Sequence, residues 1–192
     1  MKVGVVAIQG DFERHQNLLH RLNIDTILVK SPDQLQHCDA LIIPGGESTT
    51  LIKLFKASRL FEAIQVFASK KAILGTCAGL IVLSNKVLNP PLESLQLIDI
   101  EVTRNAYGRQ VDSFIQDVQL NLNGDHTQFE GVFIRAPKIT ATGQGIESIG
   151  CLQKDVVMAE NNHILVATFH PELTDDTRIH SYFIKKAKTF LP

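Results

Sequence analysis

Short apolar runs that alternate with helical patterns are the feature that most restricts how this chain can fold. The runs cover residues 2–8, 26–29, 40–43, 72–74 and 164–169. Apolar residues also recur at helical spacing before the fourth run, at Leu60, Phe61, Ile64, Phe67 and Ala68. Strands of a parallel sheet are continuously apolar because helices cover both faces of the sheet. The pattern therefore predicts an α/β fold of three layers, in which helices flank a mostly parallel sheet.

The pattern changes after about residue 85. Segments 97–102, 128–134 and 138–141 are typical of short strands separated by turns. We expect them to form an antiparallel extension of the sheet or a β-rich insertion. A final helix is indicated by an apolar stripe at Ile179, Tyr182, Phe183, Ala187 and Phe190. No repeat or linker divides the chain, so residues 1–192 are expected to form a single domain.

Charge and cysteine content narrow the class of protein. A net charge of −1 over 192 residues gives no basic surface for nucleic acid or for an anionic membrane. The longest uncharged apolar stretch, residues 72–83, has the length of a buried segment rather than a membrane span, and the apolar N-terminal run is too short for a signal peptide. Three cysteines, an odd and sparse set, favour reduced thiols. We therefore expect a cytoplasmic protein that binds neither nucleic acid nor membranes.

Cys77 lies in the segment Gly-Thr-Cys-Ala-Gly, directly after the apolar run 72–74. A nucleophile between two glycines at a strand-to-helix turn is called a nucleophile elbow, since only small neighbours permit so sharp a turn. An isolated cysteine is more often a small buried hydrophobic residue. The glycines and the preceding strand favour a nucleophile at Cys77, whereas Cys38 and Cys151 lack this setting and are expected to be inert.

His170 and Glu172 follow the apolar run 164–169. A thiol needs a base to become a thiolate, and the base needs a partner that holds its ring. Glu172 could instead be an ordinary acidic residue near the start of the last helix. We favour a catalytic triad of Cys77, His170 and Glu172, because the carboxyl ends of parallel strands meet at one rim of the sheet.

A glycine-rich loop, Pro-Gly-Gly-Glu-Ser-Thr, begins at Pro44 and follows the run 40–43. Such a loop could be a plain turn into a helix, or its free backbone N–H groups could bind an anion. Phosphate binding is disfavoured, because the lysine of the Walker motif is absent. Gln9 and Gly46 each follow a predicted strand, so we expect both at the same rim as Cys77 and His170.

Together these segments resemble the class I, triad-type glutamine amidotransferases, and more narrowly their glutaminase subunits of pyridoxal 5′-phosphate synthases. The resemblance covers nearly the whole chain. The elbow and the His-Pro-Glu segment are shared by the whole superfamily. More specific are the segments at residues 9–12, 45–50 and 104–110, and the segment 133–137 also matches. The resemblance implies a flavodoxin-like glutamine amidotransferase fold.

The resemblance also assigns residues. It implies that the N–H groups of Gly46 and Ala78 form the oxyanion hole. It places L-glutamine against Gly46, Glu47, Ser48, Arg104, Ile134 and Arg135. Arg104 and Arg135 suit the α-carboxylate, which a guanidinium can bind with two hydrogen bonds, although lone arginines are usually solvated. Gln9 and Gly10 are expected to form a loop that responds to the partner.

The function implied is hydrolysis of L-glutamine, with ammonia passed to a synthase subunit that builds pyridoxal 5′-phosphate in a hetero-oligomeric complex. No cofactor is implied, and no metal, because the cysteine and histidine positions lack ligand spacing. Two alternatives fit the same architecture. The amidotransferase-specific segments argue against a γ-glutamyl or thiol peptidase of the same fold. The intact Cys77, His170 and Glu172 set disfavours a non-catalytic docking or regulatory protein.

Overall fold

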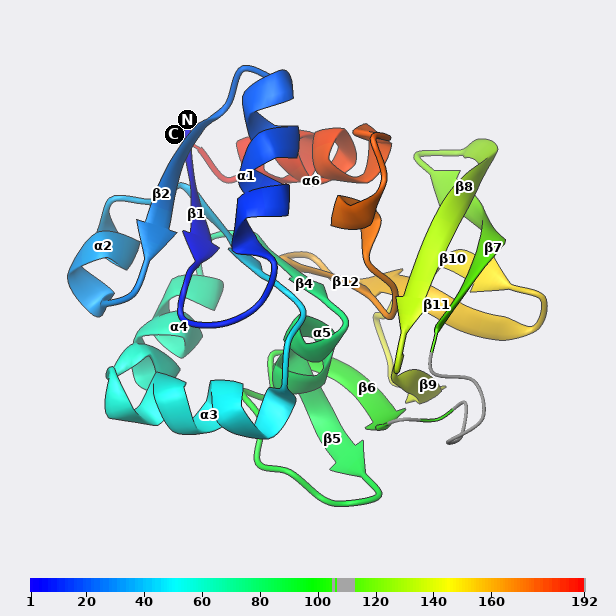
Figure 1. The fold of residues 1–192 in the computed structure, drawn as a ribbon, viewed down its shortest axis with the longest axis horizontal. Helices are drawn as coiled ribbons and strands as arrows, with labels where there is room; N and C mark the ends of the chain where they lie inside the picture. The colour runs from blue at the N-terminus through cyan, green and yellow to red at the C-terminus, as the bar shows by residue number, and fades with distance from the viewer. Residues whose placement is uncertain (105, 107–112, 192) are drawn as a thin grey trace.

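The protein is built around a large mixed sheet (Figure 1). The computed structural model describes residues 1–104, 106 and 113–191. Within these residues, the sheet has a parallel half, in spatial order β2 (Asp25–Val29), β1 (Lys2–Val6), β3 (Ala40–Ile43), β4 (Ile73–Thr76) and β12 (Ile164–Ala167). Its antiparallel half continues with β11 (Asp155–Glu160), β10 (Glu147–Leu152), β7 (Ser113–Leu122) and β8 (Asp125–Ile134). The predicted α/β fold and its antiparallel extension are confirmed.

Helices cover both faces of the parallel half (Figure 1). One face is covered by α1 (Phe12–Arg21) and α6 (Arg178–Lys188). The other face is covered by α2 (Pro32–Gln36), α3 (Ser48–Ala57), α4 (Leu60–Ala68) and α5 (Ala78–Leu83). No helix in the described part of the chain combines the length and apolar character that crossing a bilayer requires.

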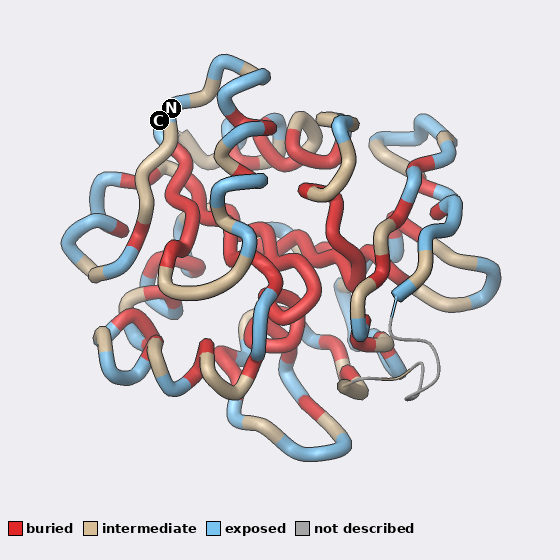
Figure 2. The backbone as a smooth tube through the Cα atoms, viewed as in Figure 1, coloured by how far each residue is buried: buried red, intermediate tan, exposed pale blue. Residues whose placement is uncertain are grey.

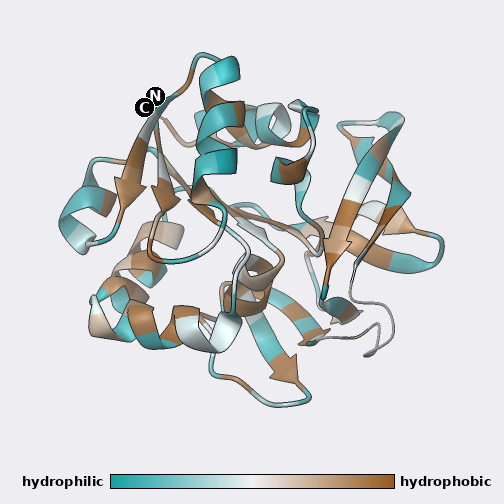
Figure 3. Ribbon diagram, in the orientation of Figure 1, coloured by the Kyte–Doolittle hydropathy of each residue, from teal (hydrophilic) through white to brown (hydrophobic). Residues whose placement is uncertain are grey.

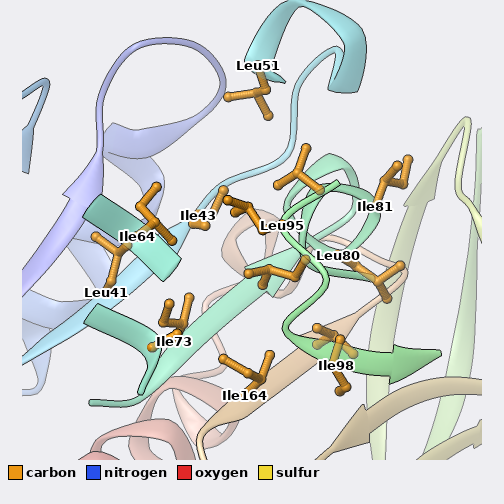
Figure 4. Packing of buried hydrophobic residues seen from close by; sticks show 14 of the residues in the cluster. Leu41, Ile43, Leu51, Ile64, Ile73, Leu80, Ile81, Leu95, Ile98 and Ile164 are labelled. Carbon is orange, nitrogen blue, oxygen red and sulfur yellow. The ribbon is translucent and has the colours of Figure 1, made fainter. Parts of the chain in front are cut away.

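Alternation of side chains explains why a central parallel strand such as β3 is apolar throughout. In β3, Ala40 and Ile42 join the core beneath α1 and α6, whereas Leu41 and Ile43 join the core beneath α3 and α4. The central strands β3, β4 and β12 are buried at every residue, whereas the edge strand β2 is partly exposed (Figure 2). Figure 4 shows the core beneath α3 and α4, in which residues of the parallel strands pack against residues of the helices. Both faces are therefore fixed by close packing.

A second, smaller sheet packs on the side of α5. It consists of β5 (Ser84–Leu88), β6 (Ile98–Thr103) and β9 (Lys138–Thr142). Ile98, Ile100 and Ile139 direct their side chains into the same core as α3 and α4. Segments 97–102 and 138–141 thus belong to this insertion, and of the three predicted segments only 128–134 extends the main sheet.

The antiparallel hairpin of β7 and β8 differs from the parallel strands in hydropathy (Figure 3). Buried Phe129 and Phe133 in β8 alternate with more exposed residues, as in a sheet with one solvated face. The carboxyl end of β8 approaches the end of β12, where the N–H of His170 donates to the carbonyl oxygen of Val132 at 2.8 Å. The segment 104–110 is described only at Arg104 and Ala106, and its other residues lie outside the described part.

Candidate active site

Cys77 occupies a sharp turn between β4 and α5. Its backbone has φ 49° and ψ −104°, a conformation that is strained for any residue with a side chain. Two hydrogen bonds hold it: its N–H donates to Ala167 O at 2.9 Å, and its carbonyl oxygen accepts from Ile81 N at 3.2 Å. A Cβ atom on Gly79 would lie 2.0 Å from Ile43 O. The glycine after the cysteine is thus required by close backbone approach.

His170 and Glu172 follow the neighbouring strand β12. The Nδ1–H of His170 donates to Glu172 Oε1 at 2.7 Å, and Glu172 is held in the short 3₁₀ helix Pro171–Leu173. A Cβ atom added to Gly45 would lie 2.4 Å from His170 Cε1 and 3.3 Å from Cys77 Cβ. The histidine and the cysteine therefore meet over Gly45, while Nδ1 of the ring is directed to Glu172.

Electrostatics favour a charged histidine and a charged carboxylate. Burial disfavours protonation of His170, but hydrogen bonds with Cys77 and Glu172 outweigh it and raise the pKa of the imidazole to about 10. Burial also opposes ionisation of Glu172, but interactions with His15 and His170 dominate and lower its pKa well below the usual range. The Glu172 carboxylate thus stabilises a protonated His170 beside the sulfur of Cys77.

The loop after β1 packs directly on the glycine-rich loop after β3. Gly10 has φ +92°, and a Cβ atom there would lie 1.8 Å from Gly45 O. The Gln9 side chain lies 3.4 Å from the position of a Cβ atom on Gly46. Gln9 Oε1 is buried and has no hydrogen-bond partner among the described residues. The loop after β1 therefore packs closely against the loop that carries Gly46 of the candidate oxyanion hole.

Glu47 caps helix α3 and also contacts Arg104. Its carboxylate accepts from Thr49 N at 3.0 Å and from Thr50 N at 2.7 Å, while Arg104 Nη2 donates to it at 3.1 Å. Partial burial acts in the opposite direction, but the hydrogen bonds from Thr50 and Thr49 lower the pKa of Glu47 to about 2. Glu47 is therefore ionised, and Arg104 has a protein partner as well as access to the cavity.

The end of β8 supplies Ile134 and Arg135. The Cys77 thiol is 3.8 Å from Ile134 O, a weak contact that aims the sulfur at this strand end. Arg135 has φ 43° and an exposed side chain, without an ion pair to any described residue. The apolar segment 133–137 can include the charged Arg135 because this residue lies just past the end of β8, where its side chain is exposed.

These side chains surround a cavity of about 310 Å³. The sequence-predicted residues that line it are Gly10, Gly46, Glu47, Ser48, Cys77, Arg104, Ile134, Arg135 and His170. Gln9, Ala78 and Glu172 lie behind this lining, against Gly46, Cys77 and His170 respectively. Across the described residues, no group of three or more His, Cys, Asp or Glu side chains is arranged to hold a metal ion.

Sequence reasoning missed two histidines next to the candidate triad. His15 of α1 and His180 of α6 are fully buried, and their rings are in contact. His15 Nε2 lies 3.4 Å from Glu172 Oε2 and 3.4 Å from Thr76 Oγ1. A signal was available, because His15 falls three residues after Phe12, on the apolar stripe of its helix.

A cysteine elbow beside a histidine–carboxylate pair defines a class of α/β enzymes that attack carbonyl groups through a thiolate. Comparison with known proteins gives the family. The chain belongs to the SNO glutamine amidotransferase family, whose model matches residues 5–189. The predicted resemblance is confirmed.

Curated relatives cover the whole chain. A pyridoxal 5′-phosphate synthase subunit PdxT of Thermosipho africanus is 47% identical over 98% of this chain and 100% of its own length. The subunit of the same name from Fervidobacterium nodosum is 45% identical over 99% of both chains.

Solved structures agree on the fold. A glutamine amidotransferase crystal structure superposes with a TM-score of 0.91 at 40% identity, over 97% of this chain and 98% of that one. A glutamine amidotransferase of Thermotoga maritima has a TM-score of 0.64 at 13% identity, covering 100% of this chain and 85% of that chain, and it supports the fold alone.

Proposed function

We propose that this chain hydrolyses the side-chain amide of L-glutamine to glutamate and ammonia, and that the ammonia passes to a synthase subunit making pyridoxal 5′-phosphate. The observation that carries the proposal is the Cys77, His170 and Glu172 arrangement beside a cavity in a glutamine amidotransferase. The relatives named as synthase subunits support the partner. Residues 1–192 would act as one cytoplasmic glutaminase domain without a cofactor.

In the first half of the reaction, His170 takes the thiol proton and the Cys77 thiolate attacks the carboxamide carbon. Glu172 holds the Nδ1–H of the ring at 2.7 Å, so that Nε2 is the nitrogen free to exchange the proton. His170 then protonates the leaving nitrogen, which departs as ammonia. A γ-glutamyl thioester remains on Cys77.

The negative oxygen of the tetrahedral intermediate requires fixed donors. Ala78 is the first residue of α5, where backbone N–H groups have no partner within the helix. Gly46 lies across the cavity in the glycine-rich loop. Their two N–H groups are the donors of the proposed oxyanion hole, and removal of one such donor costs roughly 3–4 kcal/mol in other enzymes.

In the second half, His170 removes a proton from water, which attacks the thioester carbon and releases glutamate. The regained proton returns to the thiolate, so the cycle closes without a net change in the protein. Arg104 and Arg135 line the cavity and would bind the α-carboxylate of glutamine. The ionised Glu47 on the same cavity would meet the α-ammonium group.

The test is release of glutamate and ammonia from L-glutamine by the chain in complex with the synthase subunit. The parent and Cys151→Ala should release both products, since Cys151 lies in β10, away from the cavity. Cys77→Ala should release neither. Parental activity in Cys77→Ala would remove the nucleophile assignment, and a parent that is inactive in the complex would contradict the proposed function.

A further inference from the structure

Glu172 is contacted from two sides, and the proposed triad accounts for only one of them. Oε1 accepts from His170 at 2.7 Å, whereas Oε2 is buried and has no hydrogen bond to a described residue within normal geometry. The group nearest to satisfying it is His15, whose Nε2 lies 3.4 Å away with both side chains fully buried. A buried, ionised carboxylate oxygen without a donor is costly, so a donor placed this close has a physical role.

The tautomers of the two buried histidines follow from Glu172. An ionised carboxylate only accepts hydrogen bonds, so His15 must present Nε2–H to it. His15 Nδ1 is then an acceptor, and it receives the Nε2–H of His180 at 2.9 Å. His180 Nδ1 is left bare, and it has no hydrogen-bond partner among the described residues. Each proton in the chain His180, His15 and Glu172 therefore has one consistent position.

We propose that His15 is a positioning residue for the reaction: its Nε2–H holds the second oxygen of Glu172, opposite His170, with His180 fixing the required tautomer. The inference rests on the proposed function, because it concerns the same triad. His15 is carried by α1 and His180 by α6, the two helices that cover this face of the sheet. The Glu172 carboxylate is thus held between His15 of α1 and His170, which follows β12. This contact would keep the ring of His170 in one orientation through the catalytic cycle.

The contacts of His15 support this role. The same Nε2–H is shared with Thr76 Oγ1, which accepts it at 3.4 Å, and Thr76 directly precedes Cys77. Glu172 also borders a cavity of about 230 Å³, whose charged lining residues in the described part of the chain are Arg14, Arg21 and Asp175. Arg21 is paired with Asp175 at 2.8 Å, and the Glu172 side chain is fully buried from that cavity. His15 is therefore the donor directed at Oε2.

Two amide substitutions separate positioning from packing. In His15→Gln the amide nitrogen can take the place of Nε2 and still donate to Glu172. In His15→Asn the shorter amide takes the place of Nδ1, so it can still pair with His180 but cannot reach Glu172. Both variants are made with Cys151→Ser, so that Cys77 is the thiol that alkylating reagents reach, since burial above all raises the pKa of Cys38 to about 11.

We expect His15→Asn to lower kcat on the order of 10- to 100-fold in the complex with the synthase subunit, the range seen when partners of catalytic ligands are removed. KM should stay within about twofold, and His15→Gln should recover most of the lost kcat. Equal kcat in the parent and His15→Asn would overturn the proposal. So would a loss in both variants that follows only their melting temperatures.

Alkylation of Cys77 by iodoacetamide gives a readout that does not need glutamine. The rate is followed in the full chain between about pH 5 and 10, and the midpoint should move upward in His15→Asn but not in His15→Gln. An inactive parent together with this shift would reject the proposed function and support the role of His15. Identical profiles in the parent and in both variants would reject the role of His15, whatever the parent does with glutamine.

Discussion

The two halves of the main sheet contribute different things to the candidate site. The parallel strands β3, β4 and β12 are buried at every residue, and the ends of β4 and β12 supply Cys77 and His170. The antiparallel strands β7 and β8 are longer and partly exposed, and the end of β8 supplies Ile134 and Arg135. The reacting groups thus come from the half that is buried on both faces, whereas the more solvated half adds two of the proposed substrate contacts, Ile134 and Arg135.

Register explains why the parallel half can hold the chemistry. Thr76 pairs with Ala167, so the residues that follow these two strands leave the sheet side by side. Packing on both faces prevents either strand from shifting, and small displacements are costly in catalysis. A strand with one solvated face lacks this restraint, which suits residues that close on a substrate.

The largest expected effect comes from the parallel half. His170→Ala removes the group that acts as base and then as acid, so kcat should fall roughly 10²- to 10⁴-fold. KM should change little, because His170 is not among the residues proposed to bind the α-carboxylate and α-ammonium groups of glutamine. Steady-state kinetics of the complex measure both values. A comparable loss of kcat in Arg135→Ala would erase the distinction between the two halves.

Arg135→Ala tests the antiparallel half. A charge-assisted contact with the α-carboxylate contributes about 1.5–3 kcal/mol, so KM should rise roughly 10- to 100-fold. Arg59→Ala is a matched control, because Arg59 is also exposed and also has positive φ, at 60° against 43°. Thermal melting should respond alike in the two variants. A raised KM in both variants would show that Arg135 has no particular relation to glutamine.

Gln9→Ala tests the proposed activation loop after β1. The proposal is that the isolated chain has weak glutaminase activity and that docking of the synthase brings the oxyanion donors into line, where they act on the transition state. Gln9 packs on Gly46, so its loss should reduce the rise in kcat on docking several-fold while melting changes little. The measurement is kcat with and without saturating partner. A parent with the same kcat in both conditions contradicts the activation by docking.

The smallest effect concerns acid stability. Burial above all lowers the pKa of His180 to about 3, whereas an unfolded histidine titrates near 6.5. Its contribution to stability is complete above about pH 6.5 and is lost as the pH falls towards 3, at up to about 1.4 kcal/mol per pH unit. Urea unfolding of His180→Phe should show a shallower decline. His126→Phe, at an exposed histidine of β8, should decline like the parent.

The difference between the halves also decides what the sequence could predict. Continuous apolar runs marked β3, β4 and β12, and their ends located Cys77, His170 and Glu172. The strands β5, β7, β10 and β11 were not predicted, because they mix polar with apolar residues and turns interrupt the pattern. The first strand was expected to reach Ile8 but ends at Val6, since pairing rather than hydropathy sets the boundary.

The partners of the site residues were harder to predict than the residues themselves. Arg104 was expected to face the substrate, and its ion pair with Glu47 depends on a contact between residues far apart in sequence. His15 and His180 lie 165 residues apart, and neither helix pattern shows that they meet. The local sequence pattern predicts which helix or strand carries a residue. Contacts such as those between His15 and His180 depend instead on how the helices and strands pack together.

The central claim is that Cys77 carries the glutamyl group between the two halves of the reaction. Rapid acid quenching of the complex during turnover of isotopically labelled L-glutamine, followed by mass spectrometry of its peptides, tests this directly. The account predicts one labelled γ-glutamyl group on the peptide that contains Cys77, absent from Cys77→Ala and from the peptides of Cys38 and Cys151. Glutamate production without any label on Cys77, at quench times shorter than one turnover, would contradict it.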